Sequence, residues 1–345
     1  MTIEIQSFEP ANAGETQYRA LNLLAIARER ILLPDDPPQQ LEHTQRFWKA
    51  IPPVMIVKGW IAWSGAEPVG VGTCEMLELP GQEHAAQGRL FVRPEFRRQG
   101  AGKALLAHIH AATVQHGRRV FISEALDRDP DGIAFARRVG AEVGLAMHVN
   151  QLDLAALDRN LLKRWIERAA ERAAEYELLF WHGDYPQAEL ERMVALMEAM
   201  NEAPQGSLDL EDLHWTPELL RQVEASNNAR GAERWTFAVR HCPSGELAGY
   251  TEILWLPSKR DIAGQQGATG VLNHHRDHGL GRWLKAAMLQ KVLDERPQVR
   301  FIRTSNADSN APMLKINNEL GFQPYLASSV CQVSAEQLGA YLRQG

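Results

Sequence analysis

Two short segments of this sequence combine an arginine with closely spaced glycines, a pattern suited to binding a phosphorylated ligand. Residues 97–102 and 276–281 both have the form Arg-x-x-Gly-x-Gly, and an apolar helical pattern follows each of them. Backbone N–H groups at the start of a helix bind phosphate, and glycine lets the ligand approach without a side chain in the way. The arginine adds a positive charge for a pyrophosphate. Glycines at such a turn can also be needed only for the backbone conformation, so a purely structural role stays open.

Neither segment matches two other phosphate-binding motifs. The dinucleotide-binding fingerprint needs a third glycine and a later acidic residue, and a P-loop ends in Gly-Lys followed by Ser or Thr. Both features are missing here. Hydride transfer and nucleotide hydrolysis are therefore disfavoured.

The same two segments mark an internal repeat. Arg97 and Arg276 lie about half the chain length apart, and a short helical pattern ending in glycine follows each at a similar interval, at Gly140 and Gly321. Two landmarks with matching spacing indicate a duplicated domain. We therefore expect one domain at residues 1–155, a connecting helix at 156–175 and a second domain at 176–345.

The elements that must position the glycine segments have the same order in both halves. Apolar runs at residues 88–92 and 268–272 predict a strand before each segment, and residues 103–115 and 281–293 predict the helix after it. A strand that runs through a glycine turn into a helix gathers backbone N–H groups at one point. The sequence thus predicts two similar units, each with one anion-binding turn.

Composition limits the class of protein. The 345 residues are 45% hydrophobic and 23% charged with a formal net charge of −6, which is typical of a globular protein without a basic surface for nucleic acid. The cysteines, Cys74, Cys242 and Cys331, are too far apart for a disulfide framework or a metal knuckle. The sequence has no membrane-spanning run and no secretion signal, so we expect a cytoplasmic protein.

With their flanking residues, the two segments resemble the acetyl-CoA loop of GCN5-related N-acetyltransferases (GNATs). In that family a valine precedes the arginine by five residues, as Val92 precedes Arg97 and Val271 precedes Arg276. Residues 306–322 resemble a later helix segment of the family. The likeness spans nearly the whole chain as a tandem pair, the arrangement found in mycothiol synthase-like acetyltransferases.

The resemblance implies an α/β (α+β) fold of two GNAT-like domains, each a mixed, mostly antiparallel twisted sheet flanked by helices. It also implies acetyl-CoA (coenzyme A) as cofactor, with the pantetheine arm along the valine strands, the pyrophosphate on the loops and Asn310 near the sulfur. The residues that it assigns to the cofactor are Val92, Arg97, Arg98, Gln99, Gly100, Ala101 and Gly102 in the first copy, and Val271, Leu272, Arg276, Asp277, His278, Gly279, Leu280, Gly281 and Asn310 in the second.

The second copy keeps the fuller pattern and is the expected working site, whereas the first is expected to be degenerate. Many relatives have a tyrosine that protonates the leaving thiolate, but the second copy has Asn317 there and the first has Ala136. Asn317 is thus either a hydrogen-bond donor or a packing amide. Attack by an amine needs a general base. Glu252 is the candidate, with Glu75 as its counterpart in the first copy. The alternative is a strand carboxylate that only pairs with a lysine or arginine.

Histidines near the second loop raise the question of a metal. His274 and His278 have the four-residue spacing that binds zinc when it occurs on a helix. They lie on the proposed loop, however, and no nearby carboxylate or cysteine set completes a site. We therefore expect no metal.

These observations predict an acetyl-CoA-dependent N-acetyltransferase that transfers an acetyl group directly to a primary amine of a small molecule, assisted by a general base. Two alternatives stay open. One is a non-catalytic acyl-CoA-binding or scaffolding protein, because both copies lack the tyrosine. The other is aminoacyl transfer from tRNA, which the net charge of −6 disfavours. Nucleic-acid and membrane partners are not expected, and a homodimer is left open.

Overall fold

The computed structural model describes residues 2–201 and 205–344. Contacts between residues divide the chain into two compact units. The first unit contains residues 1–147, 205–212 and 326–345, and the second contains residues 148–204 and 213–325. Each unit is therefore assembled from segments that lie far apart in the sequence.

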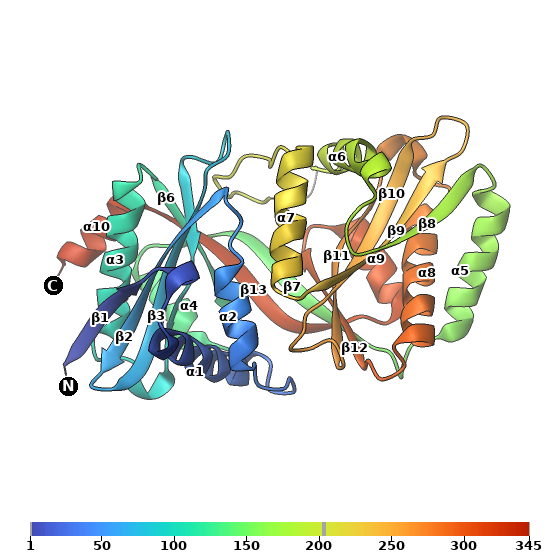
Figure 1. Ribbon diagram of the computed structural model, residues 1–345. Coiled ribbons are helices and arrows are strands. Elements are labelled where there is room, and N and C mark those ends of the chain that lie inside the picture. Colours follow the sequence, from blue (N-terminus) through green and yellow to red (C-terminus); the bar gives the residue numbers. More distant parts are fainter. Residues whose placement is uncertain (1, 202–204, 345) are drawn as a thin grey trace. The chain divides into compact units, whose positions relative to one another are not determined.

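The first unit is a mostly antiparallel sheet with helices packed against it (Figure 1). Its strands are β1 (Ile3–Phe8), β2 (Met55–Ser64), β3 (Glu67–Leu77), β4 (Ala85–Gly88), β5 (Leu90–Val92), β6 (Val120–Leu126) and most of β13 (Gln323–Ser334). Its helices are α1 (Glu15–Leu32), α2 (Leu41–Lys49), α3 (Ala101–Gln115), α4 (Pro130–Arg138) and α10 (Ala335–Arg343), with 3-10 turns η1 (Pro10–Asn12) and η2 (Pro94–Phe96). Neighbouring strands follow the order β1-β2-β3-β4-β6-β13, with β5 paired to β3, and β4 runs parallel to β6.

The second unit repeats this plan. Its strands are β8 (Tyr176–His182), β9 (Glu233–His241), β10 (Leu247–Trp255), β11 (Ala263–Val271) and β12 (Phe301–Ala307), and β7 (Glu142–Asp153) enters it from the first unit. Its helices are α5 (Arg159–Arg172), α6 (Leu190–Glu198), α7 (Pro217–Ala229), α8 (Leu280–Glu295) and α9 (Ala311–Leu320), with 3-10 turns η3 (Gln187–Glu189) and η4 (Asn273–His275). The strand order is β7-β12-β11-β10-β9-β8, and β11 runs parallel to β12.

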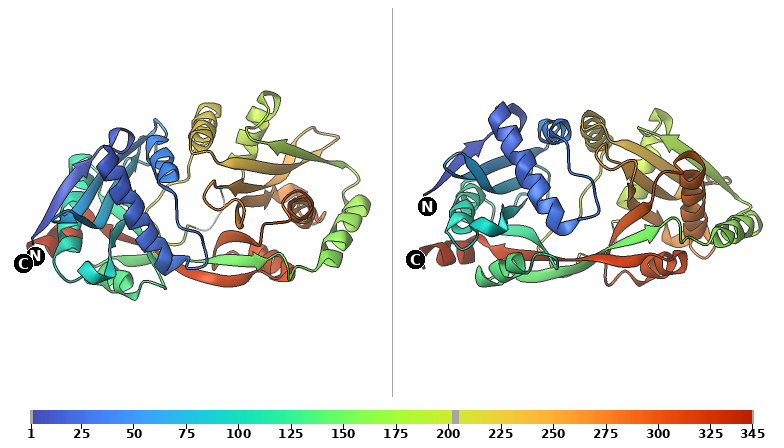
Figure 2. Two further views of the ribbon diagram at one scale, coloured as in Figure 1. Left: turned by 60° about the horizontal axis from the view of Figure 1, so that its bottom comes forward. Right: turned by 90° about the horizontal axis from the view of Figure 1, so that it is seen from below.

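Helices cover both faces of the sheet in the second unit. α6 and α7 pack on one face, where Met193, Leu220 and Tyr250 belong to one core cluster. α5 and α8 pack on the other face, where Trp235 and Trp255 are buried. Figures 1 and 2 show the strands β8 to β10 between these two layers. Because side chains alternate along a strand, each strand supplies residues to both layers.

Part of the last strand of each sequence half belongs to the other unit. From Ser328 to Ser334, β13 pairs antiparallel with β6. Residues 148–153 of β7 join the second unit, where Gln151 Oε1 accepts a hydrogen bond from Arg303 Nε at 2.7 Å. The predicted boundaries at residues 155 and 175 follow the repeat in the sequence, whereas the compact units are cut differently. An alternating pattern indicates a strand without specifying which sheet the strand joins.

The elements around the two glycine loops agree with the sequence prediction. α3 begins at Ala101 and α8 at Leu280, close to the expected starts, and α5 occupies the connecting region. The strand expected at residues 88–92 is interrupted at Arg89, which separates β4 from β5, and the strand expected at 268–272 is the end of the longer β11. Each loop therefore lies between a strand and a helix, as predicted.

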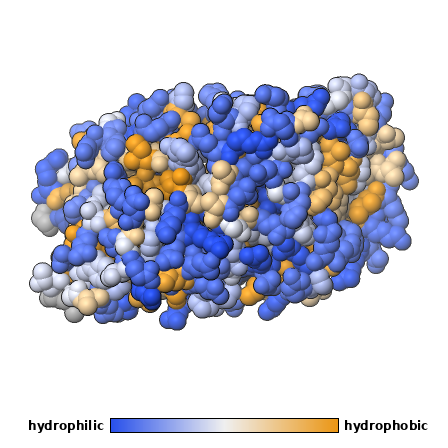
Figure 3. Space-filling view, viewed as in Figure 1, coloured by the Kyte–Doolittle hydropathy of each residue, from blue (hydrophilic) through white to orange (hydrophobic). Residues whose placement is uncertain are grey.

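Apolar side chains are mostly inside the cores. Among the described residues, the exposed large hydrophobic side chains are Leu23, Val114 and Val143. Figure 3 shows hydrophilic residues over most of the visible face, with apolar residues in smaller patches between them. No helix in the described ranges combines the length and the apolar character needed to cross a membrane.

Candidate active site

In the second unit, two parallel strands separate part of the way along their length. β11 and β12 pair until Gln266 lies opposite Thr304. Beyond this point β11 continues beside β10 to Val271, and β12 continues to Ala307. Strands that part in this way present backbone N–H and C=O groups with which an extended ligand can pair.

β11 leads into the second glycine loop, residues 276–281, whose backbone matches that of the first loop. Asp277 (φ 69°) and Gly279 (φ 80°) are left-handed, as are Arg98 (φ 60°) and Gly100 (φ 92°). Among the described residues, Arg98 and Asp277 are the only non-glycine residues with positive φ. Left-handed residues before a helix direct successive N–H groups to one point and form an anion-binding nest. The space is open, because a Cβ at either glycine would meet no atom within 4 Å.

The arginines of the two loops share one contact and differ in another. Each donates from Nε to the carbonyl oxygen of the valine five residues before it, at 2.9 Å for Arg97 and 3.4 Å for Arg276. Arg97 also pairs with Asp129 at 2.8 Å and with Asp131 at 2.9 Å. Arg276 is exposed and forms no ion pair within the described part of the chain. The charge of Arg97 is therefore paired within the chain, whereas that of Arg276 faces solvent. The next residue, Arg98 in the first loop and Asp277 in the second, is exposed in both.

Glu252, the predicted general base, lies beside the point where β11 and β12 separate. Thr251 pairs with Thr269 and Ile253 pairs with Gln266, so Glu252 of β10 lies opposite a bulge in β11 formed by Gly267 and Ala268. A Cβ at Gly267, the first residue of β11 beyond the pairing with β12, would lie 3.9 Å from Glu252 Oε1. Only 16% of the Glu252 side chain is exposed. Burial raises the pKa of this carboxyl above its ordinary value of 4.5, and the Arg234 guanidinium opposes that shift to a smaller extent.

A charged network holds this carboxyl on the α6 and α7 side of the sheet. The Tyr185 hydroxyl donates to Glu252 Oε2 at 3.0 Å, and Arg234 Nε lies 3.9 Å from the same oxygen. Arg234 also stacks on the Tyr185 ring at 3.7 Å and pairs with Glu224, which pairs in turn with Arg221. The alternative role, a carboxylate that pairs with arginine, is thus partly realised at Oε2. Oε1 lies toward Gly267 and is the oxygen that can accept another proton.

The opposite face of the same strands holds a second polar cluster, which sequence reasoning missed. Lys285 of α8 is 1% exposed and donates from Nζ to Gln266 Oε1 at 3.1 Å and to Asn317 Oδ1 at 2.8 Å. No carboxylate within the described ranges forms an ion pair with it. Burial lowers the pKa of Lys285 from 10.5 to about 7. Gln266 Nε2 donates to Thr251 Oγ1 at 3.0 Å, so hydrogen bonds connect α8 through β11 to β10.

Asn317 and Asn310, both predicted to lie near the cofactor's sulfur, make hydrogen bonds within the chain. Asn317 is 1% exposed, accepts from Lys285 and donates from Nδ2 to Asn306 Oδ1 at 2.8 Å. Asn310 caps α9 by accepting from the Met313 N–H at 3.3 Å. Both side chains are therefore fixed in place. A side-chain amide has two hydrogens, so one hydrogen of Asn317 Nδ2 is left for a further acceptor.

The first unit has the same backbone frame without the candidate base. Gly70 pairs with the valine that precedes the first loop, as Gly249 pairs with the valine that precedes the second. Counted along the strand from these glycines, Thr73 takes the place of Glu252. The predicted counterpart, Glu75, lies two residues further along β3. No carboxylate therefore stands at the equivalent position of the first unit.

A sequence model and solved structures relate this chain to known proteins. A model of the acetyltransferase (GNAT) domain matches residues 57–140, and no curated protein sequence matches the chain. The tandem GNAT protein from the clavulanic acid biosynthesis pathway is 26% identical, with a TM-score of 0.77 over 97% of this chain and 99% of that one. A GCN5-related N-acetyltransferase from Sphaerobacter thermophilus is 14% identical, with a TM-score of 0.64 over 96% of both chains.

A third similar structure is the GCN5-related glucosamine N-acetyltransferase region of a fungal multi-domain GH3 β-N-acetylglucosaminidase. It is 12% identical, with a TM-score of 0.66 over 96% of this chain and 38% of that one. The sequence model matches the first copy, whereas the fuller set of polar side chains lies in the second. Residues 57–140 thus match a GNAT domain, and the fold of nearly the whole chain is similar to that of a tandem GNAT protein.

Proposed function

We propose that this chain is an acetyl-CoA-dependent N-acetyltransferase that acetylates a primary amine of a small molecule, and that the second unit is its working site. The position of Glu252 is the main support. This largely buried carboxyl lies beside the point where β11 and β12 separate. It is on β10, which pairs with β11, and β11 leads into the anion-binding loop. The first unit has Thr73 at the corresponding place.

The groups around the separation of β11 and β12 are suited to bind the pyrophosphate and the pantetheine arm of acetyl-CoA. Left-handed residues, the start of α8 and the exposed Arg276 offer donors to a pyrophosphate. The backbone of β11 near Val271 and Leu272 offers partners to the pantetheine arm. When bound, acetyl-CoA supplies the thioester whose carbonyl carbon the amine attacks. In the first loop Asp129 and Asp131 compete with the anion for Arg97, whereas the exposed Arg98 still offers it a positive charge.

Glu252 takes the proton from the attacking amine. The amine must be neutral to attack, although a free primary amine has a pKa of about 10. A base is most effective when its pKa is near the working pH, and burial shifts the pKa of Glu252 in that direction. Tyr185 donates to Oε2, which orients the carboxyl and leaves Oε1 toward the separation of the strands.

Asn317 stands where many relatives have the tyrosine that protonates the leaving thiolate. Lys285 and Asn306 hold the two ends of its amide, so that the remaining Nδ2 hydrogen can donate to the sulfur. An amide stabilises a thiolate by hydrogen bonding but does not give up its proton. Protonation of the thiolate therefore falls to solvent. A cytoplasmic location and a homodimer remain predictions.

Release of free thiol from acetyl-CoA in the presence of a panel of primary amines tests this proposal. We expect release that depends on the amine, together with one equivalent of the acetylated amine detected by mass spectrometry. The panel contains amino acids, amino sugars and polyamines, all of which carry a primary amine. Tight binding of acetyl-CoA without turnover on any amine contradicts the proposal and favours the non-catalytic acyl-CoA-binding alternative.

A further inference from the structure

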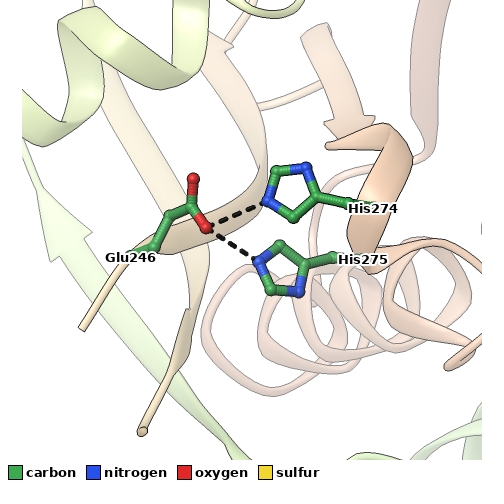
Figure 4. Close-up of side chains that lie close together, drawn as sticks. All are labelled: Glu246, His274 and His275. Carbon is green, nitrogen blue, oxygen red and sulfur yellow. Dashed lines mark hydrogen bonds and ion pairs between the residues drawn. The ribbon is translucent and has the colours of Figure 1, made fainter. Parts of the chain in front are cut away.

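Two histidines and one glutamate meet at the entrance to the second glycine loop (Figure 4). His274 and His275 end the turn η4, and Glu246 lies in the hairpin between β9 and β10. The Nε2 atoms of both histidines lie 3.0 Å from the same oxygen, Glu246 Oε2. The three ligand atoms all lie within 4.8 Å of one another. We propose that Glu246, His274 and His275 bind a divalent transition-metal ion, with Zn²⁺ the best-suited ion.

This arrangement corrects the sequence-based expectation that no carboxylate completes a set of ligands near these histidines. The carboxylate comes from the hairpin, 28 residues before His274. The second histidine is His275 rather than His278, whose Nδ1 lies 2.9 Å from the carbonyl oxygen of Arg276. Spacing along the sequence could not show this, because Glu246 reaches the histidines only through the pairing of β10 with β11.

The donor set is one that zinc prefers. Two imidazole nitrogens and one carboxylate form many zinc sites that keep a fourth position open. Ligand atoms about 2.0–2.1 Å from a tetrahedral ion lie about 3.3 Å apart. The two contacts of 3.0 Å therefore need to widen only slightly around an ion. Calcium and magnesium are disfavoured because they require more oxygen ligands than this cluster supplies.

Tyr176 orients one of the two histidines for this role. Its hydroxyl lies 2.9 Å from His275 Nδ1, and its ring packs edge-on against the imidazole with 5.6 Å between ring centres. A proton on Nδ1 leaves the Nε2 lone pair directed at the ion, as metal ligation requires. The side chain of His275 is 8% exposed and that of His274 is 63% exposed. His275 is thus held rigidly, while the exposed His274 leaves the site accessible from solvent.

In the first unit, a positively charged side chain occupies the position that corresponds to the proposed metal site. Its hairpin carries Glu67 where the second unit has Glu246, and its turn η2 carries a second carboxylate, Glu95. Arg93 lies between them, 2.6 Å from Glu67 and 2.5 Å from Glu95. A positive charge therefore joins the hairpin to the loop entrance. In the second unit Leu272 replaces Arg93, and an ion held by the two histidines and Glu246 would supply a positive charge at this place.

Equilibrium dialysis of the full chain without a histidine tag against ZnCl₂ tests the site. We expect one Zn²⁺ per chain, at least tenfold weaker binding in His274→Asn and Glu246→Gln, and unchanged binding in His214→Asn. The last variant is a matched control, because His214 is also an exposed histidine that contacts a single glutamate, at 3.3 Å. His274 is preferred to the buried His275 because its side chain is mostly exposed, so its replacement disturbs the packing less.

Two further measurements make the result independent of any enzymatic activity. Zn²⁺ raises the Tm of the wild type but not that of Glu246→Gln, because an ion that binds only the folded chain stabilises it by mass action. Co²⁺ in place of Zn²⁺ gives the strong visible absorption of a tetrahedral site. Equal Zn²⁺ affinity in the wild type, His274→Asn and Glu246→Gln overturns the proposal and leaves only a contact between histidines and a carboxylate.

Discussion

The two units share one backbone frame and differ in the side chains placed on it. Both contain parallel strands that separate, a left-handed residue followed by a left-handed glycine, and a helix that starts there. The second unit places a carboxyl, an amine and an amide around the separation, and the first places smaller or apolar groups at the same positions. The corresponding residues are Glu252, Lys285 and Asn317 in the second unit, and Thr73, Leu106 and Ala136 in the first.

This difference teaches that an anion-binding loop does not by itself identify the working copy. Gly100 and Gly279 both have positive φ, which the turn requires whether or not a ligand binds. The loop can therefore persist for structural reasons after the chemistry of a unit has been lost. The sequence model accordingly matches the first unit, where the candidate base is missing. The side chains around the point where the parallel strands part differ more between the two units than the loops do.

Among the side chains that differ between the two units, the largest expected effect comes from removing the candidate base. Glu252→Gln keeps the shape and the contact with Tyr185 but cannot accept a proton. We expect kcat to fall by about 10²–10⁴-fold, with the Kd for acetyl-CoA changed less than twofold. The pH profile of kcat/KM should also lose the rise that follows ionisation of Glu252, whose pKa burial raises. Thiol release measured across a pH series checks both points, and an unchanged kcat would remove Glu252 from the mechanism.

A second prediction concerns the buried lysine, which the first unit lacks. From about pH 7 to 10.5 the unfolded chain keeps the Lys285 proton and the folded chain does not, so the folded state gains stability as the pH rises. Lys285→Met removes this dependence. The unfolding free energy of the wild type relative to Lys285→Met should therefore increase by about 1.4 kcal/mol per pH unit over this window.

Urea denaturation at pH 7.5, 8.5 and 9.5 measures this difference. Lys163→Met is the control, because 75% of the Lys163 side chain is exposed and its replacement should give no such slope. A wild-type-minus-variant difference that stays constant with pH would mean that Lys285 remains charged in the folded chain.

The smallest effect is expected in the first loop. Asp129→Asn with Asp131→Asn frees the guanidinium of Arg97, and an asparagine at 129 can still cap α4. In a Gly279→Glu background, we expect the first loop to bind coenzyme A about two- to fivefold more tightly, since partly exposed ion pairs contribute about 0.2–1 kcal/mol. Isothermal titration calorimetry measures the change. Unaltered affinity would show that these ion pairs do not limit the first loop.

Local signals account for what the sequence could predict. The glycine loops, the helices after them and the internal repeat all depend on residues close together in the chain. Lys285 also had a local signal, because it lies four residues before the buried Leu289 on the apolar stripe of α8. Its partners, Gln266 and Asn317, come from other elements and could not be read from that stripe.

Long-range contacts account for what the sequence could not predict. The pairing of β13 with β6 joins the end of the chain to the first unit, although the alternating pattern fits either sheet. Tyr185 and Arg234 reach Glu252 from a loop and a neighbouring strand. Glu246 likewise meets the two histidines only once the hairpin is formed. Such groupings depend on tertiary packing, which spacing along the chain does not encode.

The most direct test of the central claim is acetyl-CoA turnover by Gly279→Glu and Gly100→Glu, each of which adds bulk and negative charge to one loop. Gly117→Glu is the matched control, because this glycine also has positive φ (68°) and open space around its Cβ position. We predict that Gly279→Glu abolishes turnover and that Gly100→Glu and Gly117→Glu keep most of it. Loss of activity in Gly100→Glu with normal activity in Gly279→Glu would place the working site in the first unit and contradict this account.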